Sequence, residues 1–114
     1  MNASNPTSQE WPAAEAVEQH RIVAGSPRAS SISVHQDGPS HAGLWRVSRG
    51  EFTTARRGQT EFITILEGTG RLVRDSGETI ELYPGAFAVM EDGWTGRWVI
   101  DTDLVKTFVT VTTP

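Results

Sequence analysis

The sequence contains no cysteine. This absence excludes a disulfide framework, a thiolate zinc site and a cysteine nucleophile. No apolar run approaches the roughly 18 residues that a membrane span requires, and the N-terminus lacks the basic start and apolar stretch of a secretory signal. Basic residues are outnumbered by acidic ones, and the net charge of -4 argues against nucleic acid as a partner. We therefore expect a soluble, cytoplasmic protein that binds neither membranes nor nucleic acid.

With 114 residues, the chain has room for one domain and one core. Residues 1–10 are mostly small and polar, a composition that buries too little surface to order itself. Residues 11–20 contain Pro12, which suits a first helical position, followed by several alanines. We predict a flexible N-terminal extension over 1–19, with or without a short helix, and a β-barrel over 20–114.

The remaining sequence is rich in β-branched and aromatic residues, interrupted every eight to twelve residues by glycine, proline, aspartate and serine. It shows no sustained helical period. Because parallel strands are usually connected by helices, these strands cannot form a parallel sheet. The pattern predicts an all-β, antiparallel sandwich or closed barrel. Strands are expected near 20–24, 31–36, 43–49, 51–55, 60–66, 69–74, 78–82, 86–90, 96–101 and 103–112.

Alternation along 60–66 places Glu61, Ile63 and Ile65 on one face of a strand, with Phe62 and Leu66 on the other. Because both faces are largely apolar, we predict a central strand that is covered on both sides. A carboxylate at the start of an apolar row needs a partner. Glu61 is therefore either a functional acid or a rim residue that is neutralised by a neighbouring arginine, Arg56 or Arg57, through the bend at Gly58.

Four segments, in order, resemble a small single-domain cupin of the group related to (S)-ureidoglycine aminohydrolase and the ethanolamine-utilisation cupins. They are Gly43-Leu-Trp45 with Gly50-Glu-Phe52, then Glu61-Phe-Ile-Thr-Ile-Leu-Glu67-Gly68, then Gly77 with Pro84-Gly85-Ala86-Phe87, and finally Gly93-Trp94-Thr-Gly96-Arg-Trp98 with Lys106. The resemblance covers roughly 70 residues and implies an antiparallel double-stranded β-helix, or jelly-roll barrel, of the RmlC-like type.

The chain departs from the metal-binding pattern of that family. Counting from Gly50, the two histidines and the glutamate of the first cupin motif fall at about Arg56, Gly58 and Glu61, and the second-motif histidine falls at about Ala88. The ligand set of the ureidoglycine aminohydrolase group falls near Ala55, Arg57 and Glu61, and Ala86 replaces a frequent aspartate. One carboxylate beside two guanidinium groups does not provide the three or four converging donors that a divalent metal requires. We expect no metal and no other cofactor.

The three histidines provide no alternative metal site. His20 and His35 have no neighbour at ligand spacing and are expected on the surface or in a strand. His41 precedes the strand that should line the barrel. It is either an acid–base group at the mouth of a pocket, since imidazole titrates near neutral pH, or an exposed loop residue.

Even without a metal, the cupin barrel should enclose a pocket. The resemblance implies that this pocket is lined by Trp45, Phe52, Arg56, Arg57, Glu61, Trp94 and Trp98, with Trp94 near the rim. Each tryptophan could instead be core packing. The aromatic residues with Glu61 would suit a cationic ligand, whereas Arg56 or Arg57 would suit a carboxylate or phosphate. The sequence does not choose between the two ligand charges.

Two functional classes follow for the chain. The first is a metal-free binding protein for a small polar metabolite. The second is an enzyme, such as a hydrolase of the ureidoglycine aminohydrolase kind, an isomerase or a lyase, in which Glu61 is the general acid or base and His41 a weaker candidate. A cupin that serves only as an interaction scaffold stays open as well. The resemblance also implies a homodimer.

Overall fold

The structure, a computed structural model, describes residue 5 and residues 10–114. Eleven strands and one short 3-10 helix make up this part of the chain. The elements are β1 (Glu15–Ala16), η1 (Gln19–Arg21), β2 (Ile22–Ala24), β3 (Arg28–Asp37), β4 (Ser40–Val47), β5 (Gly50–Ala55), β6 (Gln59–Glu67), β7 (Gly70–Arg74), β8 (Thr79–Leu82), β9 (Phe87–Met90), β10 (Thr95–Ile100) and β11 (Leu104–Thr112).

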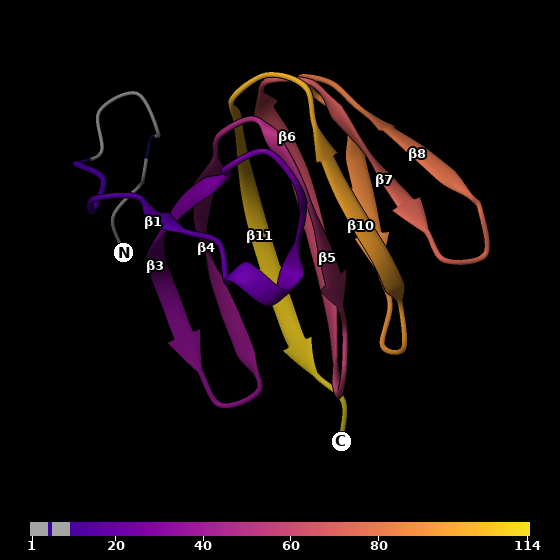
Figure 1. Cartoon of the computed structure of the whole chain (residues 1–114). Helices are drawn as coiled ribbons and strands as arrows, with labels where there is room; N and C mark the ends of the chain where they lie inside the picture. Colours follow the sequence, from indigo (N-terminus) through magenta and orange to yellow (C-terminus); the bar gives the residue numbers. More distant parts are fainter. Residues whose placement is uncertain (1–4, 6–9) are drawn as a thin grey trace.

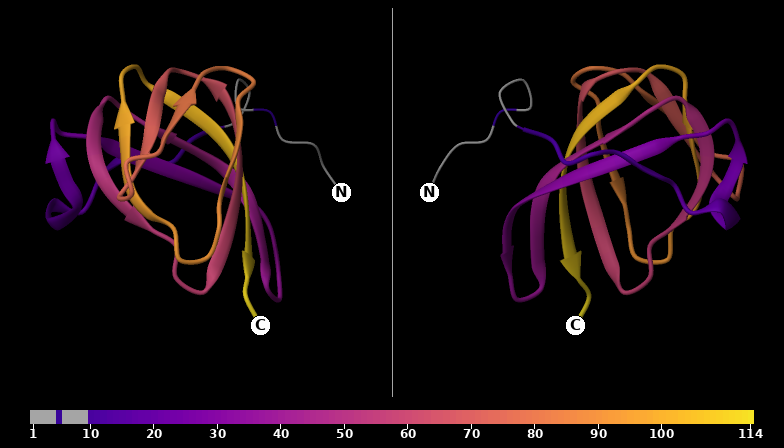
Figure 2. Two further views of the ribbon diagram at one scale, coloured as in Figure 1. Left: turned by 90° about the vertical axis from the view of Figure 1, so that its right-hand side faces the viewer. Right: turned by 60° about the vertical axis from the view of Figure 1, so that its left-hand side comes forward.

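The strands form two antiparallel sheets that curve around a common interior (Figures 1 and 2). One sheet has the order β1-β3-β4-β11-β6-β9 and the other the order β2-β5-β10-β7-β8. Strands that are distant in sequence are neighbours in space, since β11 lies between β4 and β6 and β10 lies between β5 and β7. This arrangement confirms the predicted all-β jelly-roll barrel. Within the described residues, no helix is long and apolar enough to cross a membrane.

Alternating residues from both sheets fill the interior. In β10, Gly96, Trp98 and Ile100 point inward and are buried, and in β6 the buried residues are Glu61, Ile63 and Ile65. A Cβ atom at Gly96 would lie 2.6 Å from the ring of Trp94 and 2.2 Å from the carbonyl oxygen of Val73. Glycine at this position therefore allows the Trp94 ring to pack into the core, where the residue is only 1% exposed.

The segment before the barrel differs from its prediction. No α-helix forms over 11–20; instead β1 pairs with β3, and η1 follows as a single 3-10 turn. Val17 is buried in the core, and its amide donates to the carbonyl of Pro27, so the ordered barrel begins before residue 20. Backbone pairing and burial of Val17 override the weak helical propensity of the alanines. Of the flexible extension predicted over 1–19, residues 1–4 and 6–9 lie outside the described residues.

The prediction that strand 60–66 is covered on both sides is wrong for the single chain. The side chains of β6 that face away from the interior are partly open, and Phe62 is 37% exposed. In the sheet register, Phe62 pairs with Val109 of β11 and Val89 of β9, so apolar side chains of three strands adjoin. We call this surface the outer patch; its exposed members are Phe62, Phe87, Val109 and Val111.

Candidate functional site

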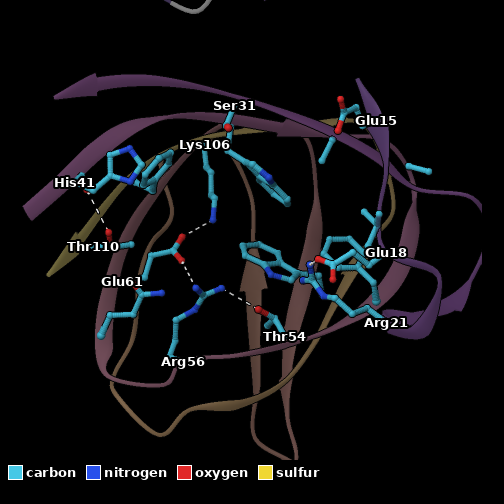
Figure 3. Close-up of a pocket in the computed structure, with 18 residues that line it drawn as sticks. Glu15, Glu18, Arg21, Ser31, His41, Thr54, Arg56, Glu61, Lys106 and Thr110 are labelled. Carbon is cyan, nitrogen blue, oxygen red and sulfur yellow. Dashed lines mark hydrogen bonds and ion pairs between the residues drawn. The ribbon is translucent and has the colours of Figure 1, made fainter. Parts of the chain in front are cut away.

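A cavity of about 490 Å³ opens at one end of the barrel interior, between the two sheets (Figure 3). Its wall combines aromatic side chains with charged and other polar side chains. The aromatic residues are Trp45, Phe52, Trp98 and Phe108, and the polar residues are Glu15, Glu18, Arg21, Ser31, His41, Thr54, Arg56, Gln59, Glu61, Lys106 and Thr110. The volume is within the range of sites for small metabolites, roughly 300–1,000 Å³.

Glu61 is the centre of the charged group. Its side chain is only 5% exposed, and its two oxygens contact two different cations. One oxygen, Oε1, lies 3.3 Å from Nη1 of Arg56, and the other, Oε2, accepts a short hydrogen bond from Nζ of Lys106 (Figure 3). One negative charge therefore faces two positive charges, and this buried cluster has a net charge of +1.

Lys106 is held in an aromatic cage formed by Trp45, Trp98 and Phe108. Its Nζ atom lies 4.5 Å from the centre of the Trp45 ring, 4.7 Å from that of Trp98 and 6.0 Å from that of Phe108. These distances are in the range of cation–π attraction. Burial lowers the pKa of the Lys106 ammonium and outweighs the opposite effect of Glu61, while the Arg56 charge lowers that pKa further.

Glycine makes room for this cage. Phe108 pairs with Gly43 across the β4–β11 ladder, and a Cβ atom at position 43 would lie 2.9 Å from the Phe108 ring. The missing side chain lets the ring lie flat over β4, beside the ammonium of Lys106.

Arg56 follows β5 and is fixed by its backbone. Its amide donates to the carbonyl of Trp94, and its own carbonyl accepts from the amide of Gly93. The side chain donates to Oγ1 of Thr54 at 2.8 Å, but its Nε atom is buried with no hydrogen-bond acceptor among the described residues. A buried donor without an acceptor is costly. The rest of the guanidinium lines the cavity, where it can donate to an anion.

The predicted pocket residues separate into two groups. The cavity brings together Trp45, Phe52, Arg56, Glu61 and Trp98. It does not include Arg57, whose side chain is exposed, or Trp94, which is buried in the core. The reason is local: Arg56 turns inward just before the bend at Gly58, which has a φ of +78°, and the ring of Trp94 fills the space over Gly96.

His41 lines the cavity at a distance from the charged cluster. Its Nε2 atom lies 3.0 Å from Oγ of Ser33, and its ring meets Phe108 edge-on, with 5.2 Å between the ring centres. The backbone carbonyl of His41 accepts a long hydrogen bond from Thr110. These contacts orient the imidazole along the wall. The other two histidines, His20 and His35, are exposed.

The mouth of the cavity carries a second ion pair. Arg21 lies 3.5 Å from Glu18, its Nε donates to the carbonyl of Thr53, and its guanidinium lies 5.5 Å from the centre of the Phe52 ring. Glu18 also approaches His20. Because these charges are more exposed than the Glu61 cluster, they are more strongly screened by water.

Lys106 is the central site residue that the sequence reasoning missed. A usable signal was present, because Lys106 is the only lysine in the sequence and alternates with Leu104 and Phe108 along β11. Lysine is rarely buried without a partner. A lysine on the inward face of a strand therefore predicts a buried carboxylate nearby, and Glu61 needed such a partner.

The donors around Glu61 do not fit a metal ion. In the described part of the chain, no group of three histidine, aspartate or glutamate side chains converges on one point. Both oxygens of Glu61 are already engaged by cations, which would repel a divalent metal. The second-motif position, Ala88, is buried in the core opposite Ile63.

A jelly roll of two antiparallel sheets with a cavity between them is an architecture that includes the cupins. The family model described as the EutQ-like cupin domain matches residues 34–108, and the chain belongs to this family. No curated protein sequence matches the chain. The predicted link to ureidoglycine aminohydrolase stays a prediction.

Solved structures share the fold at low sequence identity. A protein of unknown function from Pseudomonas syringae pv. tomato has a TM-score of 0.80 at 14% identity, over 91% of this chain and 45% of that one. The Clostridium difficile EutQ protein has a TM-score of 0.68 at 12% identity, over 76% and 64%. Ectoine synthase from P. lautus has a TM-score of 0.66 at 14% identity, over 88% and 70%. The chain thus spans less than half of the Pseudomonas protein and under two thirds of the EutQ protein.

Proposed function

We propose that this cupin barrel binds a small anionic metabolite, a carboxylate, in its interior cavity without the help of a protein-bound metal. The observation that carries the proposal is the net positive charge of the buried cluster. Arg56 and Lys106 share the single carboxylate of Glu61, so an anion bound beside them would neutralise this buried cluster. The guanidinium of Arg56 lines the cavity and is 17% exposed, so it can donate to such an anion.

The arrangement of the aromatic residues favours an anion over a cation. The aromatic cage already surrounds the protein's own ammonium group, that of Lys106, which is also paired with Glu61. A cationic ligand would have to displace this lysine or lie beside two like charges. Either arrangement costs several kcal/mol in a poorly hydrated site.

Calorimetric titration with a panel of small ligands tests the proposal. We expect heat of binding with acetate, pyruvate or succinate and none with choline. Arg56→Gln should weaken binding of the carboxylate by about tenfold or more, because a charge-assisted hydrogen bond is lost. Arg57→Gln is the matched control, since Arg57 is exposed outside the cavity, and it should bind like the wild type. Binding of choline in preference to every carboxylate would refute the proposal.

The absence of a required metal is tested separately by elemental analysis of untagged protein purified without chelators. We expect less than about a tenth of an equivalent of manganese, iron, nickel or zinc. One equivalent, retained through dialysis and reduced by Glu61→Gln, would contradict this part of the proposal.

The proposal includes a homodimer that forms through the outer patch. The patch joins exposed apolar side chains of β11, β6 and β9 on the outside of the six-stranded sheet. Contiguous apolar surface of this kind is uncommon on a monomer and is covered in most protein assemblies. A second copy of the chain is the occupant that the family resemblance favours.

A further inference from the structure

We propose that Lys106 forms an imine with the carbonyl carbon of a small 2-oxo acid, and that Glu61 moves the protons required for this reaction. The inference rests on the proposed function, from which it takes a carboxylate bound by Arg56. It adds a covalent step, a named nucleophile and a substrate class.

The position of Lys106 is the first support. A lysine used only for solubility would lie on the surface, yet the only lysine of this chain is 5% exposed and lines the cavity. Its Nζ atom lies over the rings of Trp45 and Trp98 and donates to Glu61, toward which the lysine side chain points in Figure 3.

The surroundings of Lys106 also suit a nucleophile. Only the neutral amine attacks a carbonyl, and lysine is activated when it is desolvated or placed next to another cation. Both conditions hold here, because Lys106 is buried in an aromatic cage and shares its carboxylate with Arg56. The same causes lower the pKa of the ammonium group.

Glu61 can accept the proton that activates the amine and return it when water leaves. It takes one proton from the ammonium of Lys106, which leaves a neutral amine and a carboxylic acid. The amine nitrogen then forms a bond to the carbonyl carbon, and a proton passes from this nitrogen to the former carbonyl oxygen to give a carbinolamine. Glu61 returns its proton to the hydroxyl group, the C–O bond breaks, and water leaves.

The products are a protonated imine, a water molecule and the Glu61 carboxylate, so the step needs no oxidant or reductant. Nζ carries the positive charge at the start, as an ammonium, and again at the end, as a protonated imine. The ion pair with Glu61 is therefore available both before and after imine formation, and the buried carboxylate is not left alone.

The spacing of the two cations indicates the substrate class. Arg56 and Lys106 contact the two oxygens of the same carboxylate, so they lie close enough to act on neighbouring atoms of one small molecule. A 2-oxo acid has its carbonyl carbon bonded directly to its carboxylate carbon. Arg56 would hold the carboxylate while Nζ of Lys106 reaches the carbonyl.

Reductive trapping tests the proposal with pyruvate as the probe. The full chain is incubated with pyruvate and cyanoborohydride, and its intact mass and peptide map are measured. We expect one stable adduct per chain, with the mass of pyruvate less one oxygen, on the peptide that contains Lys106. Because the chain has one lysine, the N-terminal amine is the other primary amine to be distinguished, and the peptide map separates the two.

Two other probes test the substrate class. Lactate has a hydroxyl in place of the keto group, so it should give no adduct but should compete with pyruvate. Acetone has no carboxylate and should give at least about tenfold less adduct than pyruvate at the same concentration. Arg56→Gln should lower the yield with pyruvate by a similar factor, and Arg57→Gln should not.

The outcomes separate this inference from the proposed function. If calorimetry detects pyruvate binding but no adduct appears at Lys106, the imine is refuted and the binding function stands. An adduct confined to the N-terminal amine also refutes the imine. If neither pyruvate nor any other carboxylate binds, both proposals fail. The peptide map of the wild-type protein shows whether the imine forms at Lys106, so the test does not depend on whether Lys106→Met folds.

Discussion

Lys106 and Glu61 form a buried ion pair although they are not opposite each other in the sheet. In the ladder between β11 and β6, Lys106 is opposite Ile65, whereas Glu61 is opposite Thr110. The lysine side chain therefore runs along the inner surface of the sheet, past Phe108, to reach the carboxylate. This path places the ammonium in the cavity, over the rings of Trp45 and Trp98.

The first prediction concerns the stability of this cluster. Glu61→Gln removes the carboxylate that neutralises Lys106 and Arg56, and we expect a loss of about 3–5 kcal/mol in the free energy of unfolding. Lys106→Met should cost less, because Glu61 keeps Arg56 as its partner. The double variant should recover part of the loss, since it leaves no unpaired buried charge between these two positions.

Denaturation by urea measures all of these values. Asp101→Asn is the control, because its ion pair with Arg71 is exposed and should contribute less than about 1 kcal/mol. Equal losses for Glu61→Gln and Asp101→Asn would contradict the prediction.

The barrel was predictable because its pattern is local. Alternating apolar residues and regular turn signals indicate short antiparallel strands without knowledge of their partners. The need of Glu61 for a partner was also visible in one strand. Its main partner could not be identified from that strand alone. Lys106 is 45 residues away, and the register that joins the two strands depends on the whole sheet.

The errors in the predicted site have the same origin. Trp94 and Trp98 are four residues apart in similar surroundings, but close packing over Gly96 places Trp94 in the core. Arg56 and Arg57 are adjacent, and the one that turns inward, Arg56, is held by backbone hydrogen bonds to Gly93 and Trp94 and by side-chain contacts to Thr54 and Glu61. Contacts of this kind come from strands that are distant in sequence.

The second prediction uses tryptophan fluorescence. Trp45 and Trp98 line the cavity and contact Lys106, whereas Trp94 does not line it. Ligand binding should therefore change the emission of Trp45 and Trp98. We expect Trp45→Phe and Trp98→Phe each to remove a large part of the change seen on titration with pyruvate. Trp94→Phe should keep it. A signal that is lost only in the Trp94 variant would show that the ligand binds elsewhere.

The third prediction concerns the homodimer. Phe62→Ser with Val109→Ser places two polar residues at neighbouring positions of the outer patch, and we expect the dimer to dissociate at micromolar concentration. Light scattering coupled to size exclusion gives the mass directly. Val23→Ser is a suitable control, because Val23 is exposed at 55% on the other sheet. A wild-type monomer at all concentrations would contradict the proposed dimer.

The fourth prediction is the pH dependence of trapping at Lys106. Burial lowers the pKa of this ammonium, so the neutral amine should be present at a lower pH than for an ordinary lysine, whose pKa is about 10.4. Half-maximal trapping of pyruvate should therefore occur below that pH. The Glu61 charge raises the pKa of Lys106 and the Arg56 charge lowers it. The midpoint should then move to lower pH in Glu61→Gln and to higher pH in Arg56→Gln.

The maximal rate separates the two roles of Glu61. If Glu61 acted only through its charge, Glu61→Gln would shift the midpoint and leave the plateau rate unchanged. Because we propose that Glu61 also moves protons, Glu61→Gln should lower the plateau rate as well, by a factor of about 10²–10⁴. Trapping by Arg57→Gln should follow the wild-type profile. A Glu61→Gln profile with a shifted midpoint and an undiminished plateau would remove Glu61 from the proton transfer and leave Lys106 as the nucleophile.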